Sequence, residues 1–131
     1  MAGKLILVVD DEKDIAEIVS DLLRGEGFET AMAYDGQEAL TALRRLQPDA
    51  VVLDLKMPVM DGLQVLRHMR ADPSLQTIPV VILTATRVIE DLQQELQQLL
   101  VHHCISKPFE PEELVRCVTE VLKSKEKPRH G

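Results

Sequence analysis

Short apolar runs alternate along the chain with segments whose apolar residues recur at helical spacing. Five runs have the length and composition of strands: residues 5–9, 28–34, 50–54, 79–84 and 103–106. The first is continuously apolar and rich in branched side chains, as expected of a parallel strand buried on both faces. The second carries polar residues, which predicts a strand nearer an edge of the sheet.

Capping signals mark the starts of three of the five helices predicted between and after these runs. Asp35 with Glu38, and Asp61 with Gln64, have the spacing of a capping box, in which two side chains satisfy backbone N–H groups reciprocally. Pro111 is suited to the first position of the last helix. These positions predict the beginnings of the second, third and fifth helices.

The first and fourth helices are predicted from their apolar faces. The fourth is expected as a single helix carrying apolar residues from Ile89 to Leu99, with a polar, glutamine-rich outer face that could serve for docking. The first should end near Gly25 and Gly27. Its apolar face comprises Ile15, Ile18, Val19, Leu22 and Leu23.

Strands alternating with helices imply right-handed crossovers and a parallel sheet covered on both faces. At 131 residues, the natural architecture is a flavodoxin-like, doubly wound (βα)5 fold with strand order 2-1-3-4-5. We expect one domain over residues 1–124 and a flexible tail over 125–131, which is charged and lacks apolar periodicity. A ligand crevice is then expected beyond the carboxyl ends of the first and third strands.

The composition narrows the classes of partner. With 15 basic and 22 acidic residues the net charge is −7, which argues against attraction to nucleic acid or anionic lipid. We therefore expect no membrane contact. Because no DNA-binding segment follows the predicted domain, we also expect no direct DNA binding, unless the chain is a fragment of a longer protein. The apolar run near the N-terminus is too short for a signal peptide or a membrane span, which favours a cytoplasmic location. Cys104 and Cys117 are then expected to be two reduced, buried thiols.

The predicted strands deliver chemically active side chains to one edge of the sheet. They are Asp10 and Asp11 after the first strand, Asp54 after the third, Thr84 from the fourth and Lys107 from the fifth. Three converging carboxylates repel one another unless a cation lies among them. Oxygen ligands without a nearby His or Cys favour a hard ion, and so few carboxylates suit Mg²⁺ better than Ca²⁺.

This set of groups suits phosphoryl transfer onto a carboxylate. Such chemistry needs positioning and charge neutralisation more than acid–base machinery. Asp54 is the best candidate nucleophile, because it ends the central strand while Asp10 and Asp11 can share the metal. Lys107 and Thr84 supply a cation and a hydroxyl able to hold phosphoryl oxygens.

At this point the sequence resembles the receiver domain of bacterial two-component response regulators, over about residues 4–123. The resemblance rests on four motifs in order. They are the acidic pair Asp10-Asp11, the stretch VVLDLKMPVMDG around Asp54, LTA with Thr84, and Lys107-Pro108-Phe109.

The resemblance implies a stand-alone phosphoacceptor that catalyses only its own phosphorylation and dephosphorylation and is not otherwise an enzyme. Asp54 would take the phosphoryl group from a histidine kinase or a histidine phosphotransfer protein. Asp11, Asp54 and the backbone carbonyl of Lys56 would bind Mg²⁺, and Asp10 would act directly or through water. Lys107 would contact the phosphoryl oxygens.

The resemblance also implies a switch. Thr84 would move toward the phosphoryl group and remodel the face formed by the fourth helix and the fifth strand, through which a downstream protein or a weak dimer partner would bind. The family usually has an aromatic residue where this chain has Cys104, so the coupling should be weaker or differently built. Lys56 and Thr86 would influence the lifetime of the phosphoryl group, and the bond between Lys107 and Pro108 would be cis.

Three other functions and one other metal site remain to be considered at this stage. An aspartyl-phosphate hydrolase usually has a second Asp two residues after the nucleophile, where this chain has Lys56. A flavin site would need a first loop that does not repel phosphate, unlike DDEKD. A receiver that binds partners without phosphorylation is disfavoured by the complete acidic set, but Cys104 at the usual aromatic position keeps it open. A transition-metal site at His102, His103 and Cys104 is disfavoured because consecutive strand residues point to opposite faces.

Overall fold

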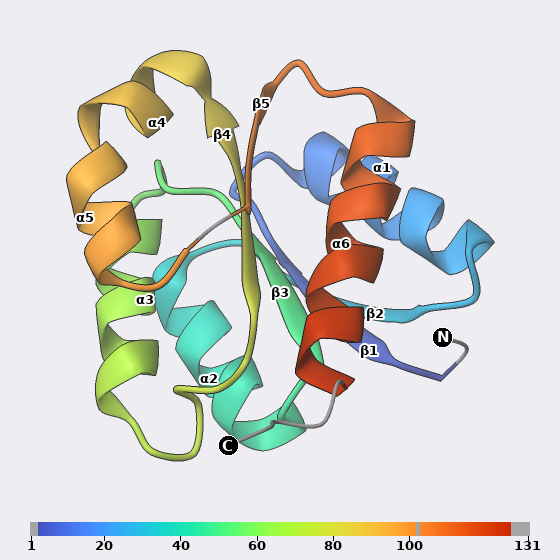
Figure 1. Ribbon diagram of the computed structural model, residues 1–131, viewed down its shortest axis with the longest axis horizontal. Coiled ribbons are helices and arrows are strands. Elements are labelled where there is room, and N and C mark those ends of the chain that lie inside the picture. Colours follow the sequence, from blue (N-terminus) through green and yellow to red (C-terminus); the bar gives the residue numbers. More distant parts are fainter. Residues whose placement is uncertain (1–2, 102, 127–131) are drawn as a thin grey trace.

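A computed structural model describes residues 3–101 and 103–126 of the chain. Five parallel strands form one sheet in the order β2-β1-β3-β4-β5, as the sequence predicts (Figure 1). The strands are β1 (Leu5–Val9), β2 (Glu29–Ala33), β3 (Ala50–Leu53), β4 (Val80–Ala85) and β5 (His103–Lys107).

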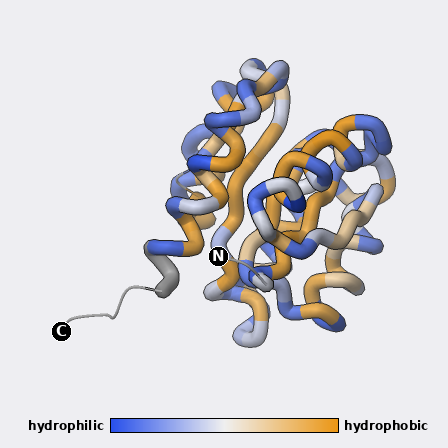
Figure 2. The backbone as a smooth tube through the Cα atoms, turned by 90° about the vertical axis from the view of Figure 1, so that its right-hand side faces the viewer, coloured by the Kyte–Doolittle hydropathy of each residue, from blue (hydrophilic) through white to orange (hydrophobic). Residues whose placement is uncertain are grey.

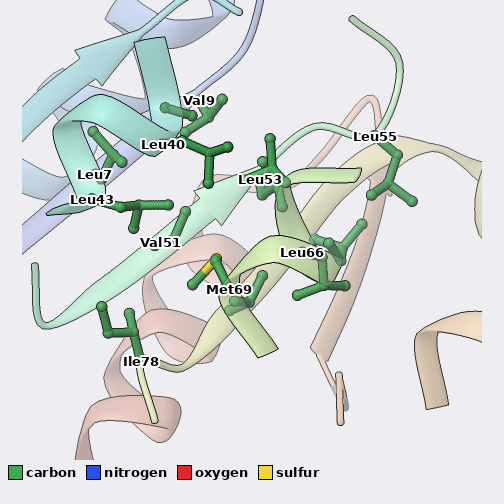
Figure 3. Close-up of a cluster of buried hydrophobic side chains, with 14 of the residues drawn as sticks. Leu7, Val9, Leu40, Leu43, Val51, Leu53, Leu55, Leu66, Met69 and Ile78 are labelled. Carbon is green, nitrogen blue, oxygen red and sulfur yellow. The ribbon is translucent and has the colours of Figure 1, made fainter. Parts of the chain in front are cut away.

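Helices cover both faces of the sheet, and hydrophobic residues run along the strands between them (Figure 2). One core lies between the sheet and α1 and α6, and a second lies on the opposite face, where α2 and α3 pack over Val51 and Leu53 (Figure 3). The helices are α1 (Lys13–Gly25), α2 (Gly36–Leu46), α3 (Gly62–Ala71), α4 (Thr86–Asp91), α5 (Gln93–Gln98) and α6 (Pro111–Glu126).

The C-terminal helix runs to Glu126, so residues 125 and 126 of the expected tail are helical. A helix can continue past its last apolar residue, because the backbone hydrogen bonds do not depend on an apolar face. The remainder of the predicted tail, residues 127–131, lies outside the described residues.

The two predicted capping boxes differ. At α3 the box is complete: Asp61 accepts the Gln64 N–H at 2.9 Å, and the Gln64 side chain accepts the Asp61 N–H at 3.0 Å. At α2, Asp35 accepts the Glu38 N–H, but the Glu38 carboxylate accepts the N–H of Tyr34 instead of that of Asp35. Both helices therefore begin where predicted, and α2 does so with half of the box.

The apolar face predicted for α1 is only partly correct. Ile18 is 49% exposed, and Ser20 is fully buried in its stead. Burial of this hydroxyl is compensated by its hydrogen bonds with Thr30 and Arg24. The buried strip of the helix is narrower than the face that the apolar pattern predicts. It comprises Ala16, Val19, Ser20 and Leu23.

The predicted single fourth helix is two short helices, α4 and α5, separated at Leu92. Val88 in α4 and Leu96 in α5 are both buried. The Leu92 N–H still donates to the Val88 carbonyl, but Leu92 itself has φ −109° and ψ +15°, outside the helical range. The prediction was wrong here because no Gly or Pro marks the break.

Helix α5 ends in a Schellman motif with an unusual residue. The Val101 N–H donates to the Leu96 carbonyl and the Leu100 N–H to that of Gln97, which places Leu100 at φ +64°. This left-handed position is usually glycine. Leu100 is also 65% exposed, so its side chain gains little from packing.

Leu100→Gly should therefore stabilise the fold. We expect a gain of about 1 kcal/mol in the free energy of unfolding, because glycine adopts positive φ without a steric penalty. Chemical denaturation measures the gain. Leu100→Ala is the control, since it removes the exposed side chain but keeps the penalty, and an equal gain in both variants would contradict the explanation.

Candidate functional site

The carboxyl edge of the sheet brings together the side chains that the sequence singles out. Asp10 and Asp54 immediately follow β1 and β3, whose last residues, Val9 and Leu53, are paired. Thr84 lies near the end of β4, and Lys107 is the last residue of β5. Parallel pairing therefore delivers one functional group from each of four adjacent strands to the same edge.

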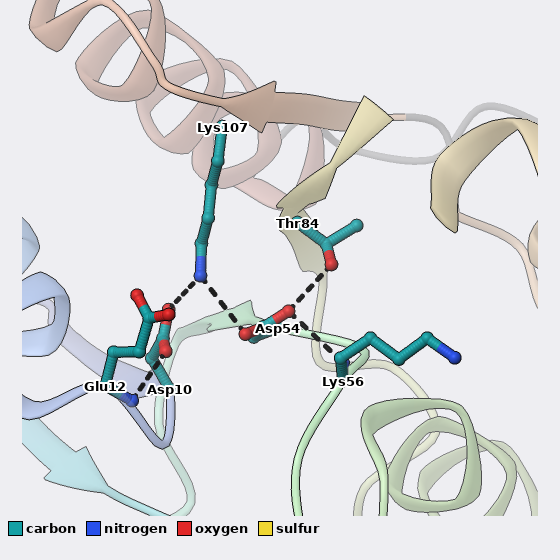
Figure 4. A network of polar contacts seen from close by, with 6 residues as sticks. All are labelled: Asp10, Glu12, Asp54, Lys56, Thr84 and Lys107. Atoms are coloured by element: carbon teal, nitrogen blue, oxygen red, sulfur yellow. Dashed lines mark hydrogen bonds and ion pairs between the residues drawn. The ribbon is translucent and has the colours of Figure 1, made fainter. Parts of the chain in front are cut away.

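Asp54 is at the centre of a hydrogen-bonded network (Figure 4). The Thr84 hydroxyl donates to Oδ1 of Asp54 at 2.7 Å, and the Lys107 ammonium donates to Oδ2 at 3.1 Å. The same ammonium donates to Oδ2 of Asp10 at 2.7 Å. Asp54 is 5% exposed and Asp10 2% exposed, so both carboxylates depend on these partners for compensation of lost hydration.

Backbone N–H groups hold the same carboxylates from the other side. The Glu12 N–H donates to Oδ1 of Asp10 at 2.9 Å, and the Lys56 N–H donates to Oδ1 of Asp54 at 3.2 Å. The Lys56 side chain is exposed and points away from Asp54 (Figure 4). Each donor lies two residues beyond the aspartate that it binds, so the local turn orients the carboxylate.

Three acidic residues form a candidate cation site. Asp10, Asp11 and Asp54 each offer a carboxylate oxygen, and these oxygens lie within 4.8 Å of one another. In the described part of the chain this is the one group of His, Cys, Asp or Glu residues that could hold a metal. Asp11 is exposed. An all-oxygen set that is partly open to water fits Mg²⁺.

The charges of the site perturb one another. Burial raises the pKa of Asp10, and the nearby Asp54 carboxylate raises it further, against the opposing effect of the Lys107 hydrogen bond. Burial alone would lower the pKa of Lys107, but the hydrogen bond to Asp10 and the charges of Asp54 and Asp10 raise it overall. The lysine therefore stays charged, and the crevice favours cations.

The loop after Asp54 depends on Gly62, the last residue of the VVLDLKMPVMDG stretch and the first residue of α3. A Cβ atom on Gly62 would lie 2.1 Å from the Asp54 carbonyl oxygen and 2.8 Å from the Leu55 Cα. The Gly62 N–H donates to the Leu55 carbonyl at 3.0 Å. Only glycine permits this approach, so Gly62 supports the backbone of Asp54 directly.

Cys104, the candidate switch residue, lies outside the Asp54 network. Its side chain is exposed, which corrects the expectation of two buried thiols, whereas Cys117 is buried as predicted and both are free. Cys104 lines a hollow between β5 and the helices α4 and α5. Because β5 is an edge strand, these helices cover it incompletely.

The neighbouring positions have ordinary surroundings. Partial burial of its thiol, and then the nearby Cys117, raise the pKa of Cys104, so the thiol stays protonated at neutral pH. His103 lies 3.4 Å from the Glu120 carboxylate, and His102 falls outside the described residues. Thr86 is exposed at the start of α4, and the peptide bond between Lys107 and Pro108 is cis, as predicted.

Comparison with known proteins agrees with this geometry. Residues 6–119 match the response regulator receiver domain family. The chain therefore belongs to the receiver domain family of two-component response regulators.

Three similar proteins, one of them a curated relative and two of them solved structures, illustrate the range of the family. The chain is 46% identical over 121 residues to the DNA-binding response regulator MtrA of Mycolicibacterium smegmatis. The aligned region covers 92% of this chain and 51% of that protein. A putative response regulator from Chloroflexus aurantiacus superposes with a TM-score of 0.85 at 34% identity, over 92% of this chain and 98% of that one. The chemotaxis response regulator CheY4 of Vibrio cholerae superposes with a TM-score of 0.84 at 31% identity, over 92% and 99% respectively.

The relatives correct one expectation. The prediction of no direct DNA binding is wrong for this family branch, because curated relatives such as MtrA are DNA-binding response regulators. The chain spans about half the length of these relatives. The prediction took only the receiver part into account, so it carries no information about the rest of such a protein.

No helix among residues 3–101 and 103–126 is long and apolar enough to cross a membrane.

Proposed function

We propose that this chain is a phosphoacceptor, in which Asp54 takes the phosphoryl group of a phosphohistidine on a histidine kinase. The observation that carries the proposal is the environment of the Asp54 carboxylate. It is nearly buried at the carboxyl edge of the sheet, where one oxygen accepts a hydrogen bond from Thr84 and the other from Lys107. A carboxylate oriented in this way is prepared for nucleophilic attack along one direction.

The transfer itself needs few participants. One Asp54 oxygen forms a bond to phosphorus as the bond from phosphorus to the histidine nitrogen breaks, and the electron pair leaves with the imidazole. Lys107 can turn its ammonium from the two carboxylates toward the phosphoryl oxygens. The Thr84 hydroxyl, which is bonded to Oδ1 of Asp54, offers a second donor to the phosphoryl group. Positioned donors of this kind stabilise the charge that spreads over the phosphoryl oxygens.

The acidic group would hold Mg²⁺. Asp11 and Asp54 are the proposed direct ligands together with the backbone carbonyl of Lys56, and Asp10 takes part directly or through water. The support is the proximity of the three carboxylate oxygens and the absence of softer donors among them. When bound, the ion offsets part of the negative charge of the carboxylates and of the incoming phosphoryl group.

The proposed output is a change in protein–protein contacts. Thr84 precedes the first residue of α4 by only two positions, so a displacement of its hydroxyl reaches that helix directly. Cys104, on the neighbouring strand, has a side chain much smaller than a ring and exposes it at the surface of this region. In this proposal the phosphoryl group binds one of two conformations better and shifts their populations. A cytoplasmic location is part of the same proposal.

Mass spectrometry tests the proposal. The chain is incubated with phosphoramidate or acetyl phosphate, with Mg²⁺ or with an excess of chelator. We expect a gain of about 80 Da, the mass of one phosphoryl group, that depends on Mg²⁺ and reverses as the acyl phosphate hydrolyses. No gain under any condition would refute the proposal, and a gain that is independent of divalent cations would refute the role of the metal.

A further inference from the structure

The loop between β3 and α3 contains a strained turn close to the phosphoacceptor. The Met60 N–H donates to the Pro58 carbonyl at 2.7 Å, and Val59 between them has φ +69°. A hydrogen bond across three residues with a positive central φ is a γ-turn of the rare, strained kind. Val59 is β-branched and 78% exposed, so neither its conformational preference nor packing of its side chain explains the turn.

A residue from another part of the chain holds this turn. Gly36 is buried at the start of α2, and a Cβ atom there would lie 2.3 Å from the Met60 carbonyl oxygen and 2.6 Å from the Met60 Cβ. The backbone of α2 therefore lies directly against Met60. A helical residue has no need of glycine for its own conformation, and glycine is a poor helix former. The close approach to Met60 explains why position 36 has no side chain.

We propose that Gly36 is a positioning residue for the phosphoacceptor. By admitting Met60, it keeps the turn at Val59 in its strained form and fixes the short loop between Asp54 and Gly62. The loop is closed at its base by the hydrogen bond from the Gly62 N–H to Leu55. Its first residues include Lys56, whose N–H orients the Asp54 carboxylate. The inference rests on the proposed function of Asp54 and extends it to the first residue of α2.

The test compares Gly36→Ala with Gly25→Ala. A Cβ atom on Gly25, at the end of α1, would meet nothing within 4 Å, so this variant controls for the general effect of replacing glycine in a helix. We expect Gly36→Ala to lower the Mg²⁺ affinity, measured by calorimetry, and the rate of phosphorylation by about fivefold or more, because small displacements of positioned groups are costly. Gly25→Ala should match the wild type in both. Equal behaviour of the two variants would overturn the inference.

A second variant decides the matter if Gly36→Ala does not fold. Val59→Gly removes the strain and frees the loop, so we expect a higher melting temperature together with weaker Mg²⁺ binding and slower phosphorylation. Val59→Ala is its control, since it shortens the side chain but keeps the loop restrained. Wild-type Mg²⁺ affinity and rate in Val59→Gly would overturn the inference. Failure of the wild type to accept a phosphoryl group would instead refute the proposed function.

Discussion

Asp54→Asn should abolish phosphorylation while leaving the protein folded. The amide has nearly the shape of the carboxylate, and its oxygen can still accept hydrogen bonds from Thr84 and from the Lys56 N–H. It lacks the negative charge and the nucleophilic oxygen that attack on phosphorus requires. The pKa of Asp10 is raised mainly by burial and to a smaller extent by the Asp54 charge, and removal of that charge relieves the second effect. Stability should therefore be equal to or greater than that of the wild type.

Asp61→Asn is the matched control in the same loop. Asparagine caps helices about as well as aspartate, so the start of α3 should be preserved. Intact mass after incubation with phosphoramidate and Mg²⁺ should show phosphoryl uptake in the wild type and in Asp61→Asn, and none in Asp54→Asn. Persistent uptake in Asp54→Asn would contradict the assignment of the acceptor.

Lys107→Met should have the second largest effect. Lys107 is the cation bonded to both Asp10 and Asp54, and its side chain is only 20% exposed. Without it we expect phosphorylation to slow by about 100-fold, as for the loss of one donor to a developing oxyanion. The two carboxylates would also lose their shared partner, and we expect a loss of about 2 kcal/mol in stability at neutral pH.

The pH dependence of this loss has a defined sign. Without Lys107 the pKa of Asp10, already raised by burial, should rise further above its ordinary 3.8. The folded variant then binds more protons than the unfolded chain in this range, so its stability should fall as the pH rises from 3.8 through the folded-state pKa. Chemical denaturation of Lys107→Met should therefore show a smaller deficit in acid than at neutral pH. A deficit that does not vary with pH would contradict the pairing.

The wild type should show the complementary behaviour in alkali. The folded-state pKa of Lys107 lies above its ordinary 10.5, so the stability from its ion pairs is fully present below pH 10.5. It should disappear as the pH rises through the folded-state value. The difference in stability between wild type and Lys107→Met isolates this contribution from the other groups that titrate in the same range.

Much of the fold follows from features visible in the sequence. The strands are short apolar runs, and the starts of α2, α3 and α6 coincide with Asp35, Asp61 and Pro111. The strand order matches the doubly wound arrangement that is common for alternating strands and helices at this chain length. The exposure of Ile18 could not be read in the same way, because it depends on how much of α1 the sheet covers.

Helix breaks and unusual backbone conformations were harder to predict because the residue types at these positions do not indicate them. Leu92 interrupts a helix although leucine is a good helix former, and Leu100 adopts a conformation that glycine usually takes. At Leu100 the demands of tertiary packing outweigh local preference. Leu96 and Val101 must reach the core on either side of Leu100.

The candidate site was predictable where topology alone determines it. Groups at the ends of parallel strands must share one edge, and Asp54, Thr84 and Lys107 do so. The roles assigned to them stay predictions. The contacts of Gly36 and Gly62 could not be predicted, because they arise where a loop passes within a few ångströms of another backbone. Such an approach leaves no periodic signal in the sequence.

Chemical trapping of the phosphorylated residue is the most direct test of the central claim, that Asp54 is the phosphoacceptor. The chain is phosphorylated with phosphoramidate and Mg²⁺ and reduced with borohydride, which converts an aspartyl phosphate to the corresponding alcohol. Peptide mass spectrometry then locates the product. We predict conversion at residue 54 alone. Conversion at Asp10 or Asp11, or at no aspartate in a chain that has gained the phosphoryl mass, would contradict the claim.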